Sequence, residues 1–136
     1  MDSFSFFTAG PLARINVSEK LPDLSILDGA NFREGPGPAV ISKYETAARD
    51  VVLYRGLKFP TYLVCEQGGY IDGIILEVQD PELNQWVDEL DKFEASYGLA
   101  KEERIFNSKH GLKTAFIYVV KQLSDVKIDV LTRFEQ

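Results

Sequence analysis

Apolar residues along this chain occur mostly in short runs that Gly and Pro interrupt, which predicts a domain built largely from β-strands. Ser3–Thr8 is aromatic and partly alternating, and it stops at Ala9-Gly10-Pro11-Leu12. We therefore expect a central strand that runs into a tight turn. Further strands are predicted where β-branched and aromatic residues cluster: Val40–Ala47, Val51–Leu57, Tyr62–Cys65, Ile71–Val78, Thr114–Val120 and Val126–Leu131.

The connections between these segments suggest how the strands are arranged. Arg49-Asp50 separates the second and third strands, which indicates two strands or a bent pair. The Gln67–Tyr70 turn separates the fourth and fifth, which indicates a hairpin or neighbouring strands of a meander. Ala13–Pro38 is irregular, with Ser18–Leu27 as a candidate short helix, and loops of this length are often functional.

One segment, Asp80–Glu94, has a clear helical period. It begins with Asp80 and Pro81, which favour helix N-termini, and Gly98 is a candidate terminator. Its apolar residues recur at helical spacing and define one stripe that must face the core: Leu83, Trp86, Val87, Leu90 and Phe93.

Glu94 breaks this pattern. At about 100° per residue it projects within roughly 20° of Leu83, near the middle of the apolar stripe. Asp88, Glu89 and Lys92 are expected to point outward instead. An ionised carboxylate on a buried face is unfavourable without partners, and burial near the negative end of a helix should raise its pKa.

Two interpretations of Glu94 stay open on periodicity alone. In the first, the helix ends before Glu94 and leaves it in solvent, or its carboxylate pairs with a buried Arg or Lys. In the second, Glu94 is a general acid/base, whose useful pKa lies near the working pH.

Length and composition indicate one folded domain spanning residues 1–136. The chain is 45% hydrophobic and 26% charged, values that are typical of globular proteins. A net charge of −6 with scattered Lys and Arg argues against nucleic acid as a partner. We expect no membrane partner and a cytoplasmic protein, because no run approaches a membrane span and the N-terminus lacks a signal-peptide pattern.

The single cysteine and single histidine offer little chemistry. Cys65 lies in an apolar run, which favours the role of a small hydrophobe over that of a nucleophile. His110 lies in a polar turn, Ser108–Gly111, that we expect to be solvated. These counts leave no cluster with zinc-ligand spacing, although they do not exclude carboxylate sites for Mg²⁺ or Ca²⁺.

Five weak motifs follow one another in an order that resembles the gamma-glutamylcyclotransferase-like family: the N-terminal strand with its glycine turn, Phe59-Pro60, Ile71–Val78, Leu90–Glu94 and Ala115–Tyr118. Family members typically carry a strand ending in Tyr-Gly-Thr/Ser-Leu, a Tyr-Pro, a Val-x-Gly strand, a Leu-Asp-x-x-Glu-Gly helix end and a late Ala-x-x-Tyr strand. The resemblance covers nearly the whole chain, although no single motif is specific.

The resemblance implies an α+β fold, a small mixed β-barrel of about six strands with flanking helices and a cavity at one mouth. It places the catalytic carboxylate on Glu94 and implies a small-molecule substrate and no cofactor or metal. In the family reaction, a γ-glutamyl α-amine attacks its own side-chain amide, forming 5-oxoproline and releasing an amine. One Glu shuttles the proton, and backbone N–H groups of the glycine turn hold substrate oxygens.

The substrate turn departs from the family pattern. Ala9, Gly10, Pro11 and Leu12 stand where the family has Tyr-Gly-Thr-Leu, which removes two hydroxyls and one backbone donor. Substrate recognition there must differ, which favours a specialised substrate. Tyr97 and Tyr118 are candidate donors near the carboxylate, or alternatively packing residues at the barrel rim.

Three functions follow. The first is a cyclotransferase-type acid/base enzyme, and a biosynthetic cyclase or lyase with different chemistry in the same cavity is a variant of it. The second is a non-catalytic binding or regulatory module on the same barrel. The third is an unrelated β-rich domain with an exposed Glu94. The retained Glu94 favours chemistry, whereas the altered Ala9 and Pro11 favour its loss.

Overall fold

The computed structural model describes residues 2–21, 37–54 and 61–122. Its elements in chain order are β1 (Ser3–Thr8), the 3-10 helix η1 (Pro11–Arg14), β2 (Ala39–Arg49), β3 (Val51–Tyr54), β4 (Thr61–Val64), β5 (Tyr70–Gln79), the α-helix α2 (Leu83–Ser96), β6 (Ala100–Ser108) and β7 (Gly111–Val120).

The seven described strands form one mixed sheet in the order β2-β5-β1-β7-β4-β3, and β6 pairs with β7. β1 is antiparallel to β5 and parallel to β7, so both of its edges are occupied. This confirms the prediction that the first strand is central. Its last residue, Thr8, is held opposite Ile74 of β5, which fixes where the chain enters the following turn.

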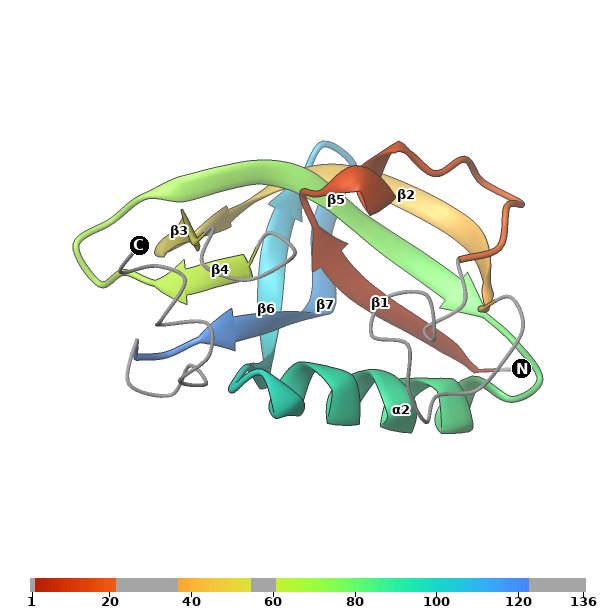
Figure 1. The fold of residues 1–136 in the computed structure, drawn as a ribbon. Coiled ribbons are helices and arrows are strands. Elements are labelled where there is room, and N and C mark those ends of the chain that lie inside the picture. Colours follow the sequence, from red (N-terminus) through yellow and green to blue (C-terminus); the bar gives the residue numbers. More distant parts are fainter. Residues whose placement is uncertain (1, 22–36, 55–60, 123–136) are drawn as a thin grey trace.

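The sheet is strongly curved but is not closed into a barrel (Figure 1). The predicted barrel of about six strands is therefore wrong, although the mixed, sheet-dominated α+β class is confirmed. One edge of β7 is divided, because β1 pairs with it at Phe116 whereas β4 pairs with it at Val119 and Val120. The two strands at the ends of this order, β2 and β3, are consecutive in the chain and are separated only by Asp50, as predicted for a bent pair. Within the described residues, one α-helix accompanies the sheet.

α2 lies along one side of the sheet, below β1 in the view of Figure 1. The apolar stripe predicted for this helix is buried at four positions, Leu83, Trp86, Leu90 and Phe93. Trp86 packs its ring against Phe4 and Phe6 of β1 at centroid distances of 6.4 and 6.3 Å. A second core group, which includes Phe7 of β1, lies apart from this helix: Phe7, Ala48, Val51, Tyr62, Ile75, Phe106, Ala115, Ile117 and Val119.

The C-terminus of α2 is closed by a Schellman motif. The Leu99 N–H donates to the carbonyl of Glu94 at 3.1 Å, and the Gly98 N–H donates to that of Ala95 at 3.0 Å. Gly98 has φ 86°, which glycine adopts without strain, as expected of the predicted terminator. Glu94 therefore lies in the last helical turn, and the helix does not end before it.

Two predictions about the elements are wrong, and one strand was missed. β4 and β5 are not neighbours, because β4 pairs with β3 and β7 while β5 pairs with β1 and β2. The strand β6, which pairs along β7, was not predicted, because its many charged residues obscure the alternation of more buried and more exposed side chains. The described part of Ser18–Leu27 is not helical, because Ser18 has φ 79° and Lys20 bridges to Ala39.

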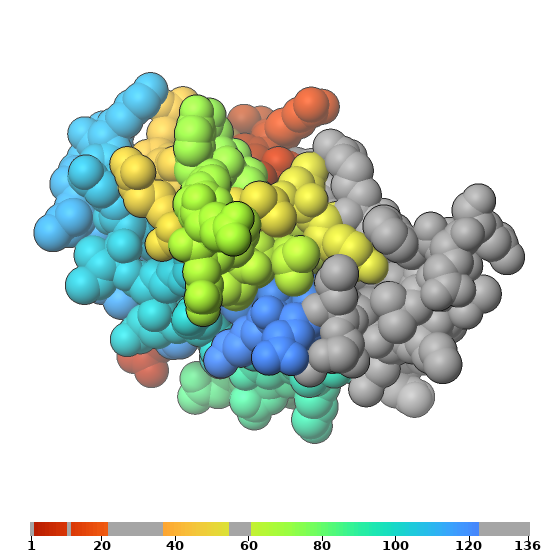
Figure 2. Space-filling model, turned by 90° about the vertical axis from the view of Figure 1, so that its left-hand side faces the viewer, coloured from red at the N-terminus to blue at the C-terminus, as the bar shows by residue number. Residues whose placement is uncertain are grey.

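Residues 22–27, 55–60 and 126–131, which include parts of predicted elements and Phe59-Pro60, lie outside the described residues. In the side view, the loop between β4 and β5 and the C-terminal part of β7 share one face, with α2 below them (Figure 2). In the described ranges, no helix is both long and apolar enough to span a membrane.

Candidate functional site

Glu94 presents a carboxyl group enclosed in the fold. The side chain is half-buried overall, but its Oε2 atom has no exposed surface and no hydrogen-bond partner among the described residues. Burial, and then the charge of Asp91, raise the pKa of Glu94 to about 8. The carboxyl can therefore both hold and release a proton near neutral pH.

Asp91 lies one turn before Glu94 and joins three elements. Its Oδ1 accepts a hydrogen bond from the hydroxyl of Tyr118 in β7 at 2.7 Å, and its Oδ2 forms a salt bridge with Lys101 Nζ of β6 at 2.8 Å. Burial raises the pKa of Tyr118, as do Asp91 and the charge of Glu94, so its phenol stays neutral. Tyr118 thus donates its hydroxyl hydrogen to Asp91 and not to Glu94.

Tyr62 joins β4 to the N-terminal turn. This buried tyrosine accepts a hydrogen bond at its hydroxyl oxygen from the Ala9 N–H at 2.8 Å. Burial raises the pKa of Tyr62; Ala9 and Thr8 oppose that effect, and the charge of Glu94 adds to it. Ring contact with Phe7 at 5.4 Å fixes the side chain in the core. The Ala9 amide, expected to be open to substrate, already has a protein acceptor.

The rest of the turn forms η1. Gly10 has φ −86°, an ordinary extended value, so the unusual dihedral expected there is absent. Its carbonyl accepts from the Ala13 N–H, and the carbonyl of Leu12 accepts from the Ile15 N–H. The Leu12 side chain packs against the core. Pro11 begins η1, as its fixed φ favours.

The Tyr97 side chain packs against its neighbours, which is the second of the two roles expected for it. Its ring meets that of Phe93 edge-on at 5.5 Å, and its side chain lies against the core. Its backbone N–H donates to the carbonyl of Glu94 as part of the helix end.

The structure thus joins Tyr118 to Asp91, one turn before Glu94, and joins Tyr62 to the turn at Ala9. The charge of Glu94 acts on both tyrosines. Sequence reasoning missed Asp91 and Tyr62. Asp91 had a signal, since it lies three residues before Glu94 and so on the same helix face. Tyr62 had none beyond its type, because its contact with Ala9 joins residues 53 positions apart.

One side chain of α2 departs from the predicted outer face. Asp88 and Lys92 are exposed as predicted, but Glu89 is half-buried, and its Oε2 is enclosed without a partner in the described residues. The prediction that Glu89 points outward is therefore wrong, because the helix is covered on more than its apolar stripe.

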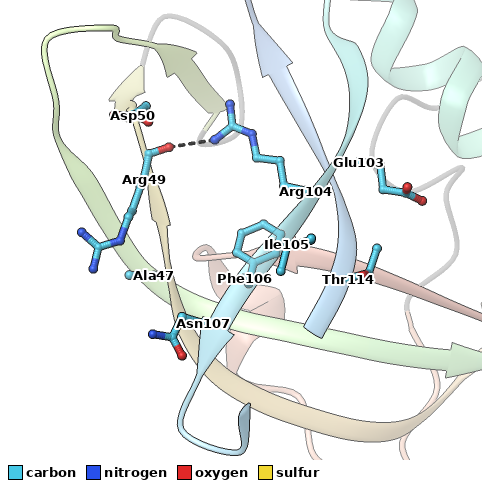
Figure 3. Close-up of a pocket in the computed structure, with 9 residues that line it drawn as sticks. All are labelled: Ala47, Arg49, Asp50, Glu103, Arg104, Ile105, Phe106, Asn107 and Thr114. Atoms are coloured by element: carbon cyan, nitrogen blue, oxygen red, sulfur yellow. Dashed lines mark hydrogen bonds between the residues drawn. The ribbon is translucent and has the colours of Figure 1, made fainter. Parts of the chain in front are cut away.

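Two surface cavities open elsewhere on the described part of the chain. One, of about 690 Å³, lies between the bend at Asp50 and β6, where Arg104 donates to the carbonyl of Arg49 at 2.7 Å (Figure 3). The other, of about 440 Å³, is lined by Phe4, Lys101 and the first half of α2. Glu94 lines neither cavity. Within the described residues, no group of three His, Cys, Asp or Glu side chains could hold a metal ion.

Comparison with known proteins defines similarity at the level of the fold. No family model matches the sequence, and no curated protein matches it. The solution structure of At5g39720.1 from Arabidopsis thaliana is similar with a TM-score of 0.53 and 13% identity, over 96% of this chain and 75% of that one. A structure titled gamma-glutamyl cyclotransferase has a TM-score of 0.49 and 14% identity, over 89% of this chain and 68% of that one. The similarity to the first structure shows a shared fold and nothing about activity.

Proposed function

We propose that this protein is a cyclotransferase-type acid/base enzyme that uses Glu94 as its proton shuttle. The observation that carries the proposal is the enclosed Glu94 carboxyl, which has no ion-pair partner among the described residues and a pKa raised to about 8. Such a pKa matches a general acid/base at neutral pH. The order of sequence motifs described above supplies the reaction class.

The proposed substrate is a γ-glutamyl amide. Its α-amino nitrogen bonds to the carbon of its own side-chain amide, and the bond from that carbon to the leaving nitrogen breaks. The α-ammonium first loses one proton to solvent and becomes the neutral amine that attacks. Glu94 takes the second proton from this nitrogen as the new bond forms and delivers it to the leaving nitrogen, so the products are 5-oxoproline and a free amine. A raised pKa suits both steps, since an α-amine titrates near pH 8. Attack within one molecule needs orientation more than activation.

Tyr62 and Ala9 make recognition in this turn different from the family pattern. The Ala9 N–H is engaged by Tyr62, and Pro11 has no N–H. A substrate must therefore use other donors or displace the tyrosine hydroxyl, which supports a specialised substrate over an ordinary one.

Mass spectrometry of the full chain incubated with a panel of γ-glutamyl amides tests the proposal. We expect wild type to release 5-oxoproline and amine in equal amounts. Glu94→Gln keeps the shape but cannot shuttle the proton, so its rate should fall by roughly 100-fold or more. Glu89→Gln is the matched control, because it makes the same change at another enclosed carboxyl of α2.

Equal loss in both variants, or full activity in Glu94→Gln, would contradict the assigned role. Absence of product in wild type across the panel would reject γ-glutamyl amide cyclisation. The engaged Ala9 amide favours a binding module as the second candidate, and binding of a panel compound to wild type without turnover would support it.

A further inference from the structure

A cluster of charged and polar groups surrounds Asp91, one helical turn before Glu94. Lys101 Nζ contacts Asp91 Oδ2 at 2.8 Å, and Tyr118 donates to Asp91 Oδ1 at 2.7 Å. The three residues come from β6, α2 and β7, so the contacts tie the helix to the sheet. Asp91 and Glu94, three residues apart on α2, lie on neighbouring positions of one helix face.

We propose that the Lys101–Asp91 pair is a positioning pair for Glu94, in which Asp91 opposes ionisation of the carboxyl from one helical turn away and Lys101 offsets that effect. Asp91 is the nearby negative charge that makes ionisation of Glu94 less favourable. Lys101 holds Asp91 in place and offsets part of that charge. Both act on Glu94 without contact to the reacting atoms.

Among the described residues, the charge of Glu94 also acts on two tyrosines. Tyr62 of β4 and Tyr118 of β7 each interact with its charge, and burial raises the pKa of both phenols. They stay neutral over the range in which Glu94 titrates. Asp91, together with Lys101 that contacts it, therefore supplies the charges that can change how readily Glu94 ionises.

Lys101 is placed where solution conditions reach it. About 30% of its side chain is exposed, and it lines the cavity beside the first half of α2. Its ammonium lies 4.9 Å from the Phe116 ring centroid and 5.8 Å from that of Phe4. These rings hold the charge over the sheet, so the contact with Asp91 has a defined geometry and stays open to screening by salt.

The consequence for catalysis rests on the proposed function: the acid and base limbs of the pH–rate profile should follow the proton affinity of Glu94. The titration itself does not depend on any activity. The proposal and the proposed function can therefore fail separately.

Carbon-detected NMR titration of the Glu94 carboxyl in the full chain tests the inference. Asp91→Asn keeps an acceptor for Tyr118 and should lower the midpoint of the Glu94 titration by roughly one pH unit. Lys101→Met keeps the apolar stem and should raise it. Lys101→Arg retains the charge and should leave it near the wild-type value.

Opposite shifts in the first two variants support the proposal even if no substrate is ever turned over. An unchanged midpoint in Asp91→Asn, or a lower one in Lys101→Met, overturns it even if the enzyme is active. If Asp91→Asn does not fold, the two variants of the partly exposed Lys101 still test the proposal. Equal titration midpoints of Glu94 in Lys101→Met and Lys101→Arg would refute the role of the charge. Added salt should raise the wild-type midpoint and leave that of Lys101→Met in place.

Discussion

Tyr62 shows how a single hydroxyl joins residues far apart in the chain. It accepts the Ala9 N–H, and its ring packs against Phe7 of β1. The charge of Glu94 acts on the same phenol. The position of the N-terminal turn relative to β4 therefore depends on this residue.

We expect Tyr62→Phe to destabilise the protein by about 1 kcal/mol or somewhat more, because a half-buried N–H loses its acceptor while the ring packing is kept. Urea unfolding measures the loss, and an amide NMR spectrum should show the Ala9 signal moving upfield. Tyr70→Phe removes a hydroxyl from a side chain that is 66% exposed and should be nearly neutral. Equal effects of the two substitutions would refute the role of the Ala9 bond.

At the scale of elements, β1 is positioned by its contact with β5. Gly73 lies next to the last register pair of the two strands, Thr8 opposite Ile74, at the end that enters the turn. A Cβ at this residue would lie 2.6 Å from Phe7 Cζ and 2.7 Å from the carbonyl oxygen of Thr8. Because one of these atoms belongs to the backbone, a side-chain rotation cannot relieve the overlap.

Gly73→Ala should therefore push the end of β1 away from β5 and destabilise the fold by about 1 to 3 kcal/mol. Gly111→Ala is a useful comparison, because its Cβ would meet nothing within 4 Å and only its φ of 101° is strained. Chemical denaturation should rank Gly73→Ala as the more damaging change, with amide shifts spreading to Ala9. The reverse ranking would show that β1 has room to move.

At the scale of the whole molecule, Glu94 links stability to pH. Its pKa is about 8 in the fold against 4.5 for an ordinary Glu, so between these values the folded state holds a proton that the unfolded chain has lost. Stability from this group is complete below pH 4.5, falls as the pH rises towards 8, and is then lost. Each tenfold difference in proton affinity between the folded and the unfolded chain changes the free energy of unfolding by about 1.4 kcal/mol.

Glu94→Gln removes this dependence. We expect the variant and wild type to have similar stability near pH 4.5 and the variant to be more stable by a few kcal/mol at pH 8.5, as measured by thermal and urea unfolding. Glu89→Gln supplies the comparison at each pH. A Glu94→Gln variant that is less stable than wild type at pH 8.5 would mean that the ionised carboxylate has partners in the fold.

Local patterns in the sequence determined several features of this protein. The period of the segment ending at Glu94 predicted a helix, its buried stripe and the anomalous carboxyl, because helical phase depends on neighbours within a few turns. Gly98 predicted where the helix stops for the same reason. Aromatic and β-branched runs predicted most described strands, and the central place of Ser3–Thr8 is confirmed.

Tertiary structure alone decided which distant groups surround that carboxyl. The pairing of Tyr62 with Ala9, the bridge from Lys101 to Asp91 and the division of β7 between two partners join residues far apart in the chain or on different elements. None leaves a periodic trace in the sequence, because these contacts depend on how the elements pack. The same packing left the sheet open and withdrew Glu94 from water, which raises its pKa.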